Sequence, residues 1–143
     1  MFSSSTKGIL MTSSNAQWVK QALIELFVKR DLSAIDRYWA APYLQHNPSL
    51  PDGVELLRDI VAGLQPDFSY EPGMVVAQGD MLMVHGRYSG WRPKPVVAVD
   101  IFLVKDGRMV EHWDVLQEEV PSYITKSQRP MFGLPQWTQE STK

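Results

Sequence analysis

The chain has 143 residues, no cysteine and a formal net charge of −2, and 44% of its residues are hydrophobic. This length and composition suit one globular domain with a core large enough to enclose a pocket. The near balance of acidic and basic residues provides no field that would attract nucleic acid or an anionic membrane surface. The lack of cysteine excludes disulfides, thiolate metal sites and a cysteine nucleophile, and we expect a cytoplasmic protein.

Three regions are expected along the chain. Residues 1–14 contain several serines and one short apolar run, too short for a secretory signal, and are expected to form a disordered arm. Residues 15–120 are expected to form a single α+β domain. Residues 121–143 contain prolines and apolar residues without a period, which predicts an irregular C-terminal tail. No stretch approaches the length of a membrane span.

The first half of the chain predicts helices. Apolar residues recur at helical spacing in the first of them: Val19, Ala22, Leu23, Leu26 and Phe27. A second helix is expected over about residues 33–41, ended by Pro42, and a third between Asp52 and Pro66. The loop over residues 43–48, between the last two helices, is rich in side chains that form hydrogen bonds.

The second half predicts two β-hairpins. The expected strands cover residues 74–77, 81–88, 96–104 and 109–117. The first pair is joined by a turn at Gln78-Gly79-Asp80 and the second by a turn at Asp106-Gly107. Helices followed by an antiparallel sheet indicate the α+β class.

The second turn decides which residues share a face of the sheet, because side chains alternate between the two faces of a strand. A two-residue turn places Asp100 opposite Trp113, and a three-residue loop places it opposite His112. We favour the three-residue loop, because it gathers Asp100, His112 and Asp114 on one face among apolar residues.

Both faces of the last two strands are largely apolar. We expect the helices to cover one face and a second copy of the chain to cover the other, which gives a homodimer. The residues expected on this outer face are Ile101, Leu103, Met109 and Trp113.

Three segments of the chain resemble the pattern of SnoaL-like proteins. They are residues 43–48 (Tyr-Leu-Gln-His-Asn-Pro), 99–104 (Val-Asp-Ile-Phe-Leu-Val) and 106–115 (Asp-Gly-Arg-Met-Val-Glu-His-Trp-Asp-Val). The resemblance extends over about residues 15–117. It implies the nuclear transport factor 2-like fold, a curved antiparallel sheet wrapped by N-terminal helices into a cone with a deep pocket, usually dimeric through the sheet.

The resemblance also implies a chemistry. Characterised SnoaL-like cyclases close a ring by intramolecular aldol condensation without a cofactor, using a carboxylate as acid and base. The wider superfamily includes ketosteroid isomerases, whose pocket aspartic acid stands where Asp100 stands here. It also includes limonene epoxide hydrolases, which place an Arg and an Asp near the positions of His85 and Arg87. Their paired carboxylates are not reproduced in this chain, so epoxide hydrolysis is not expected.

Four residues are candidates for catalysis. Asp100 interrupts an apolar strand, and burial there disfavours the charged form of a carboxyl group, so that it can act as an acid. The alternative is that Asp100 pairs with Arg87 at the surface. Asp114 is the second candidate carboxylate, and His46 and His112 are the candidate base and proton relay. The candidate substrate-binding residues are Tyr43, Asn47, His85, Arg87, Phe102 and Trp39.

These observations leave two functions open. The first is a cofactor-free enzyme that moves a proton next to the carbonyl group of a small, mostly apolar compound, for cyclisation or double-bond isomerisation. The second is a module that binds a ligand or partner without turnover. No metal site is expected, because the histidines lack close ligand spacing, and no Gly-rich phosphate loop indicates a nucleotide cofactor.

Overall fold

The computed structural model describes residues 14–137. The helical elements are residues 14–23, their π-helical continuation η1 (Ile24–Val28), α2 (Ser33–Tyr38), α3 (Glu55–Ala62) and the short 3₁₀ turn η2 (Ser122–Ile124). The strands are β1 (Trp39–Gln45), β2 (Ser69–Gln78), β3 (Met81–Ser89), β4 (Val96–Lys105) and β5 (Arg108–Glu118). In this part of the chain, no helix is both long and apolar enough to cross a bilayer.

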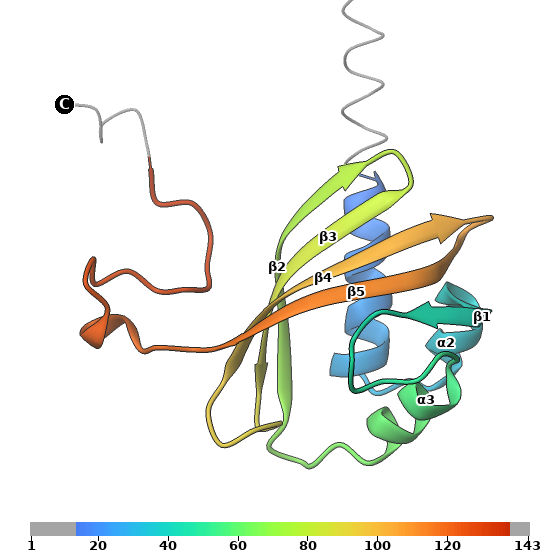
Figure 1. Ribbon diagram of the computed structural model, residues 1–143, viewed down its shortest axis with the longest axis horizontal. Helices are drawn as coiled ribbons and strands as arrows, with labels where there is room; N and C mark the ends of the chain where they lie inside the picture. The colour runs from blue at the N-terminus through green and yellow to red at the C-terminus, as the bar shows by residue number, and fades with distance from the viewer. Residues whose placement is uncertain (1–13, 138–143) are drawn as a thin grey trace, which may run out of the picture.

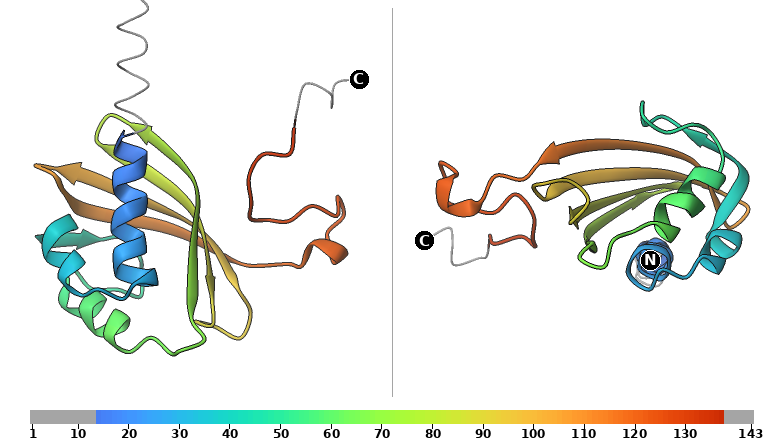
Figure 2. Two further views of the ribbon diagram at one scale, coloured as in Figure 1. Left: turned by 180° about the vertical axis from the view of Figure 1, so that it is seen from behind. Right: turned by 90° about the horizontal axis from the view of Figure 1, so that it is seen from below.

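The five strands form one curved sheet in the order β1-β5-β4-β3-β2 (Figure 1). The strands β2 to β5 form an antiparallel meander, and β1 adds at the edge, parallel to β5. In the right-hand view of Figure 2 the sheet is an arc, with the N-terminal helix, α2 and α3 on its concave side. The expected α+β class and the curved sheet wrapped by N-terminal helices are confirmed.

Strand β1 lies where a helix end and a loop were expected. Helix α2 ends at Tyr38, three residues before the expected end at Ala41, and the chain then extends as β1. The physical reason is Pro42, which disfavours helical backbone at the residue before it and cannot donate within a sheet ladder. An edge strand tolerates this proline, because one side of the strand needs no hydrogen-bond partner.

The turn between β4 and β5 has two residues, not three. Lys105 pairs with Arg108, and Asp106 and Gly107 between them have positive φ angles of 51° and 74°. Two successive residues with positive φ are typical of a type I′ turn, whose twist matches that of the flanking strands. The expected three-residue loop is therefore wrong.

A β-bulge nevertheless brings the ionisable groups together. The pairing of β4 with β5 shifts by one residue between Leu103 and Val104, where Val110 is left without an opposite residue. Beyond this bulge Asp100 lies opposite Asp114, so that Asp100, His112 and Asp114 share the concave face. The expected grouping is correct, although neither register considered from the sequence is the one observed.

The same bulge corrects the expected position of Met109. This residue was placed on the outer face with Trp113, but it is fully buried in the core. One unpaired residue reverses the alternation of side chains, so Met109 and His112 lie on the same face despite their odd and even numbers. The core lies between this face and the helices and includes Val19, Leu23, Leu26, Ile35, Val84, Phe102 and Met109.

The convex face carries an apolar row across four strands. Val76 pairs with Met83, Met83 with Ile101, and Ile101 with Trp113. Met83 is 41% exposed and Val76 63% exposed in the single chain. The chain after β5 extends away from the helices. In this segment the ring of Phe132 packs against Gly73, so closely that a Cβ atom added to Gly73 would lie 2.8 Å from the ring. Residues 1–13, most of the expected N-terminal arm, lie outside the described part of the chain.

Candidate functional site

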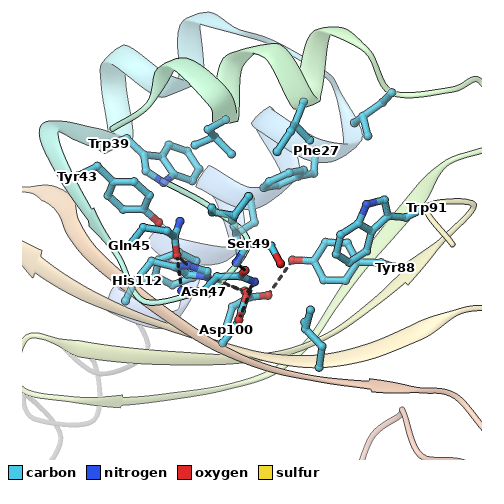
Figure 3. Close-up of a pocket in the computed structure, with 18 of the residues that line it drawn as sticks. Phe27, Trp39, Tyr43, Gln45, Asn47, Ser49, Tyr88, Trp91, Asp100 and His112 are labelled. Carbon is cyan, nitrogen blue, oxygen red and sulfur yellow. Dashed lines mark hydrogen bonds and ion pairs between the residues drawn. The ribbon is translucent and has the colours of Figure 1, made fainter. Parts of the chain in front are cut away.

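A cavity of about 400 Å³ lies between the concave face of the sheet and the helices (Figure 3). Its walls are mostly apolar and come from the N-terminal helix, α3 and the inner face of the sheet. The apolar and aromatic lining includes Phe27, Leu57, Ile60, Leu64, Phe68, Phe102 and Leu116. The carboxyl groups of Asp100 and Asp114 and the ring of His112 also line it. An apolar cavity with a few convergent polar groups is the usual form of a small-molecule site.

Asp100 is held from both sides. Only 4% of it is exposed, Oδ1 lies 2.8 Å from Nε2 of His112, and Oδ2 accepts a 2.7 Å hydrogen bond from the Tyr88 hydroxyl group. Burial, together with the nearby charge of Asp100, raises the pKa of Tyr88 well above its usual range. Tyr88 therefore keeps its proton at neutral pH and is the donor in its bond to Asp100. The alternative in which Asp100 pairs with Arg87 is wrong, because Arg87 bonds Glu119 and Glu71.

The amide of Gln45 determines which nitrogen of His112 carries a proton. Oε1 of Gln45 lies 2.5 Å from Nδ1 of His112 and also accepts the backbone N–H of Asn47 at 3.2 Å. Because the backbone N–H can only donate, Oε1 faces both groups, and Nδ1 of His112 is the donor to it. The bond between Nε2 and Asp100 then holds one proton, in either an imidazolium–carboxylate pair or a neutral imidazole–carboxylic acid pair.

Asp114 is a second carboxyl group beside this pair. Nδ2 of Asn47 donates to its two oxygens at 3.0 and 2.8 Å, and its Oδ2 lies 3.8 Å from Nε2 of His112. An amide donor leaves lone pairs of the carboxylate available on the cavity side. The arrangement places a proton-sharing pair and a carboxylate base within reach of one ligand.

The segment Gln45–Asn47 straddles strand β5. Its central residue, His46, lies on the convex side, where its ring stacks on Trp113 at 4.5 Å between centroids with 6° between the planes. Nε2 of His46 lies 2.6 Å from Oε2 of Glu111, and its backbone N–H donates to the carbonyl of His112 at 2.9 Å. The residues on either side of His46 reach the concave side and hold the two groups described above. His46 was expected to be a catalytic residue in the cavity, but it does not line the cavity.

The remaining expected site residues divide between the two faces of the sheet. Tyr43, Phe102 and Trp39 line the cavity, and Nε1 of Trp39 is buried with no hydrogen-bond partner among the described residues. Burial raises the pKa of Tyr43 above its usual range. His85 and Arg87 lie on the convex face and do not line the cavity, because the inward residues of β3 are the even-numbered ones, Leu82, Val84, Gly86 and Tyr88.

Sequence reasoning missed several lining residues. Gln45 was noted in a polar loop without a role, although its place next to Asn47 in a resembling motif was a signal. The sequence contained a signal for Tyr88 as well. Tyr88 lies four residues after the apolar residue Val84 in the same strand, so the two side chains point to the same face of the sheet. Trp91 and Arg92 belong to an irregular loop, whose position follows from no period in the sequence.

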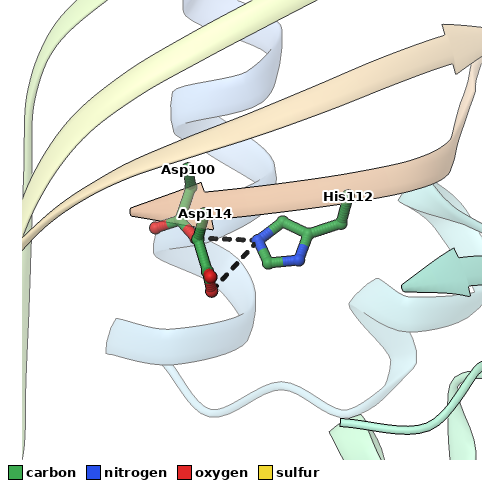
Figure 4. Close-up of side chains that lie close together, drawn as sticks. All are labelled: Asp100, His112 and Asp114. Carbon is green, nitrogen blue, oxygen red and sulfur yellow. Dashed lines mark hydrogen bonds and ion pairs between the residues drawn. The ribbon is translucent and has the colours of Figure 1, made fainter. Parts of the chain in front are cut away.

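The three ionisable groups also have the spacing of metal ligands. One atom each of Asp100, His112 and Asp114 lies within 4.8 Å of the others (Figure 4). Both oxygens of Asp100 and both nitrogens of His112 already take part in hydrogen bonds to protein groups. A cation would have to replace several of these bonds, so the geometry fits a proton-transfer group better than a metal centre.

Residues 21–112 match the family model of the SnoaL-like domain, which is more than half of the chain. The chain therefore belongs to the SnoaL-like family, within the nuclear transport factor 2-like superfamily. None of the curated proteins matches its sequence.

Solved structures share the fold at low sequence identity. The chain is similar to TsrD from Streptomyces laurentii, with 23% identity, a TM-score of 0.63, and coverage of 73% of this chain and 89% of that one. It is similar to a protein named a polyketide cyclase from Bacillus cereus, with 21% identity, a TM-score of 0.59 and coverage of 68% and 71%. An LEH-like epoxide hydrolase from M. tuberculosis has 16% identity, a TM-score of 0.57 and coverage of 75% and 85%.

Proposed function

We propose that the chain binds a small, mostly apolar carbonyl compound in its cavity and catalyses a cofactor-free proton transfer next to the carbonyl group. Aldol-type cyclisation and double-bond isomerisation both begin with this step. The observation that supports the proposal is the proton-sharing pair of Asp100 and His112, buried beside a second carboxylate in an apolar cavity. Buried ionisable groups that hold one another in this way are typical of acid–base sites.

The contacts suggest different roles for the two carboxylates. Both oxygens of Asp100 already accept bonds from Tyr88 and His112, whereas Asp114 is held by a single amide. Asp114 is therefore assigned as the base that takes a proton from the carbon next to the carbonyl. The electron pair of the broken C–H bond moves to the carbonyl oxygen and forms an enolate. This makes Asp114 the carboxylic acid and leaves Asp100 and His112 free to act on the oxygen.

Two groups are suited to stabilise the enolate. The Asp100–His112 pair holds a proton that it can share with the developing negative charge, and the electron pair returns to carbon as the new bond forms. Trp39 lines the cavity, and its Nε1 is a buried N–H donor with no hydrogen-bond partner in the described part of the chain, which we assign to the enolate as well. A donor that is already buried and oriented stabilises charge without the cost of reorganising water.

The two functions can be separated with a ketone that reports only the first step. Exchange of the α-hydrogens of 2-tetralone for deuterium in D₂O would be followed by NMR, with ligand binding measured in the same sample. We expect the wild type to accelerate exchange and Asp114→Asn to reduce the acceleration by roughly 100-fold or more. Ser69→Ala, outside the cavity, is the control. Binding of the ketone without faster exchange would contradict catalysis and support a binding module.

The convex face supports a homodimer as the functional form. The row from Val76 to Trp113 is apolar and partly exposed, and Val115 beside it is 67% exposed. A contiguous apolar surface of this kind favours association with a second sheet. Dimerisation through this face would leave the cavity open, because the cavity lies on the opposite side of the sheet.

A further inference from the structure

The cavity has a second polar feature, separate from the carboxyl groups. The loop between β3 and β4 contributes Trp91 and Arg92 to the lining, and both are exposed to solvent as well. They therefore lie where the cavity opens. The guanidinium carbon of Arg92 lies 4.5 Å from the centroid of the Trp91 ring, within the range of a cation–π contact.

A continuous line of contacts joins this opening to the interior. Arg92 stacks on Trp91, the Trp91 ring lies 5.7 Å from the ring of Tyr88, and the hydroxyl group of Tyr88 donates to Asp100. Figure 3 shows Trp91 and Tyr88 side by side on one wall of the cavity. A ligand that lies along this wall would have one end at the opening and the other at the carboxyl groups.

Charge is distributed unevenly along this wall. Arg92 is the single lysine or arginine among the lining residues, and the carboxyl group of Asp100 lies deeper, beyond Tyr88. The ion pairs of the described residues do not include Arg92, whereas its loop neighbour Lys94 faces Glu118 at 3.5 Å. A guanidinium group fixed on an aromatic ring, with its N–H donors available, is well suited to bind an anionic oxygen group.

We propose that Arg92 and Trp91 form a subsite for an anionic group, so that the ligand class is an amphiphilic anion: an apolar carbonyl body with a carboxylate or a similar group at the end that faces solvent. This inference rests on the proposed function for the body of the ligand. The anionic end determines which way round the ligand enters. Arg92 attracts it to the opening, and the carboxylate of Asp114 repels it from the interior. The carbonyl end therefore meets the acid–base groups.

Two fluorescent probes that differ by one charge test the subsite. The first, 1-anilinonaphthalene-8-sulfonate, is the anionic counterpart of the neutral N-phenyl-1-naphthylamine. We expect Arg92→Gln to weaken binding of the sulfonate roughly threefold to fivefold and to leave binding of the neutral probe unchanged. Arg92→Lys, which keeps the charge, should restore part of the loss. The difference between the probes should shrink in 0.5 M salt, because charges at the opening are screened.

Two further variants make the result specific. Lys94→Gln removes the same charge from the same loop outside the cavity, and it should leave the ratio of the two affinities unchanged. Leu57→Trp fills the cavity and should reduce binding of both probes, after its melting temperature has shown that it folds. An affinity ratio that Arg92→Gln does not alter would overturn the subsite and leave the proposed function standing. Failure of both probes to bind the wild type would overturn the apolar cavity as a ligand site, and the subsite with it.

Discussion

Nδ1 of His112 donates to Oε1 of Gln45, so the only nitrogen left to face Asp100 is Nε2, 2.8 Å from the carboxyl oxygen. Gln45, which is far from His112 in the sequence, thus places a proton on Nδ1 and directs Nε2 toward Asp100. The carboxyl group of Asp100 is in turn fixed by Tyr88. This chain of bonds orients the proton-sharing pair before any ligand enters.

Asp100→Asn should preserve the fold and remove the exchangeable proton. The new amide can donate to a neutral Nε2 of His112 and accept from Tyr88, so the free energy of unfolding should change little. The rate of proton removal from an enolisable ketone should fall roughly 100-fold, because the enolate loses a stabilising group. Nitrogen NMR shifts of His112 should show that Nδ1 still carries a proton, because its bond to Gln45 is unchanged.

Asp100→Ala is the contrasting variant for this prediction. It leaves the buried hydroxyl group of Tyr88 and the ring of His112 without their partner, which costs about 1–3 kcal/mol for each unsatisfied group. Denaturation in urea would measure this cost. An unchanged rate in the Asn variant would remove Asp100 from the mechanism and leave Asp114 as the carboxylate to examine.

His46 should influence the reaction although it lies outside the cavity. Its stack on Trp113 and its bond to Glu111 anchor the segment whose neighbouring residues hold His112 and Asp114. His46→Ala should lower kcat roughly tenfold to 100-fold with little change in KM, because the acid–base groups are displaced while the walls of the cavity remain. His46→Gln, which can still donate to Glu111, should recover part of the rate.

The control for His46 is Val115→Ala, which truncates an exposed side chain on the same face of β5. It should leave the rate and the nitrogen shifts of His112 unchanged. If His46→Ala behaves like this control in both measurements, the contacts of His46 with Trp113 and Glu111 are not needed to position Gln45 and Asn47, and the prediction is wrong.

The convex face should form the dimer contact. Sedimentation equilibrium at micromolar concentration should give about twice the chain mass of 16.3 kDa. Met83→Lys places a charge in the middle of the apolar row and should produce monomers that keep their secondary structure. Val28→Lys changes a side chain that is 50% exposed on the helical side and should leave the dimer intact. A monomeric wild type would exclude the proposed assembly.

Glu25 should contribute to stability in a defined pH range. Hydrogen bonds from Tyr38, Gln21 and Arg37 lower the pKa of Glu25 from 4.5 to about 2. The folded state therefore favours the charged form, and this stabilisation is fully present above about pH 4.5 and is lost as the pH falls toward 2. Glu25→Gln should be less stable than the wild type at pH 7, and the two should converge near pH 2.

Urea denaturation across this pH range would test the prediction, with Asp59→Asn on the exposed side of α3 as the control. The control should show no comparable convergence. A difference between Glu25→Gln and the wild type that is constant with pH would mean that the hydrogen bonds do not depend on the charge of Glu25.

No metal should be needed for the fold or for ligand binding. The candidate ligand atoms of Asp100 and His112 are engaged in bonds to protein groups, and a cation would have to break them. Treatment with EDTA, followed by addition of Zn²⁺, should leave the melting temperature and probe affinity unchanged. Elemental analysis showing one tightly bound transition metal per chain, lost in Asp114→Asn, would refute this.

The sequence by itself determined the fold class and most of the elements. Helical spacing from Val19 to Phe27 and the two hairpins rest on local patterns, which depend on neighbours a few residues apart. The main local error was the prediction of a helix end and a loop where the structure has strand β1. Pro42 marked the boundary, but the partner of β1 is β5, more than sixty residues later, and no local pattern contains it.

Only the tertiary structure decided which candidates share the site. A single bulged residue, Val110, sets the register that brings Asp100 opposite Asp114, and neither turn length considered from the sequence includes it. The polar loop was found from its composition, but the division of its residues between two faces depends on its parallel pairing with β5. Register is a long-range property, because it is fixed by the packing of whole strands and not by the residues that it brings together.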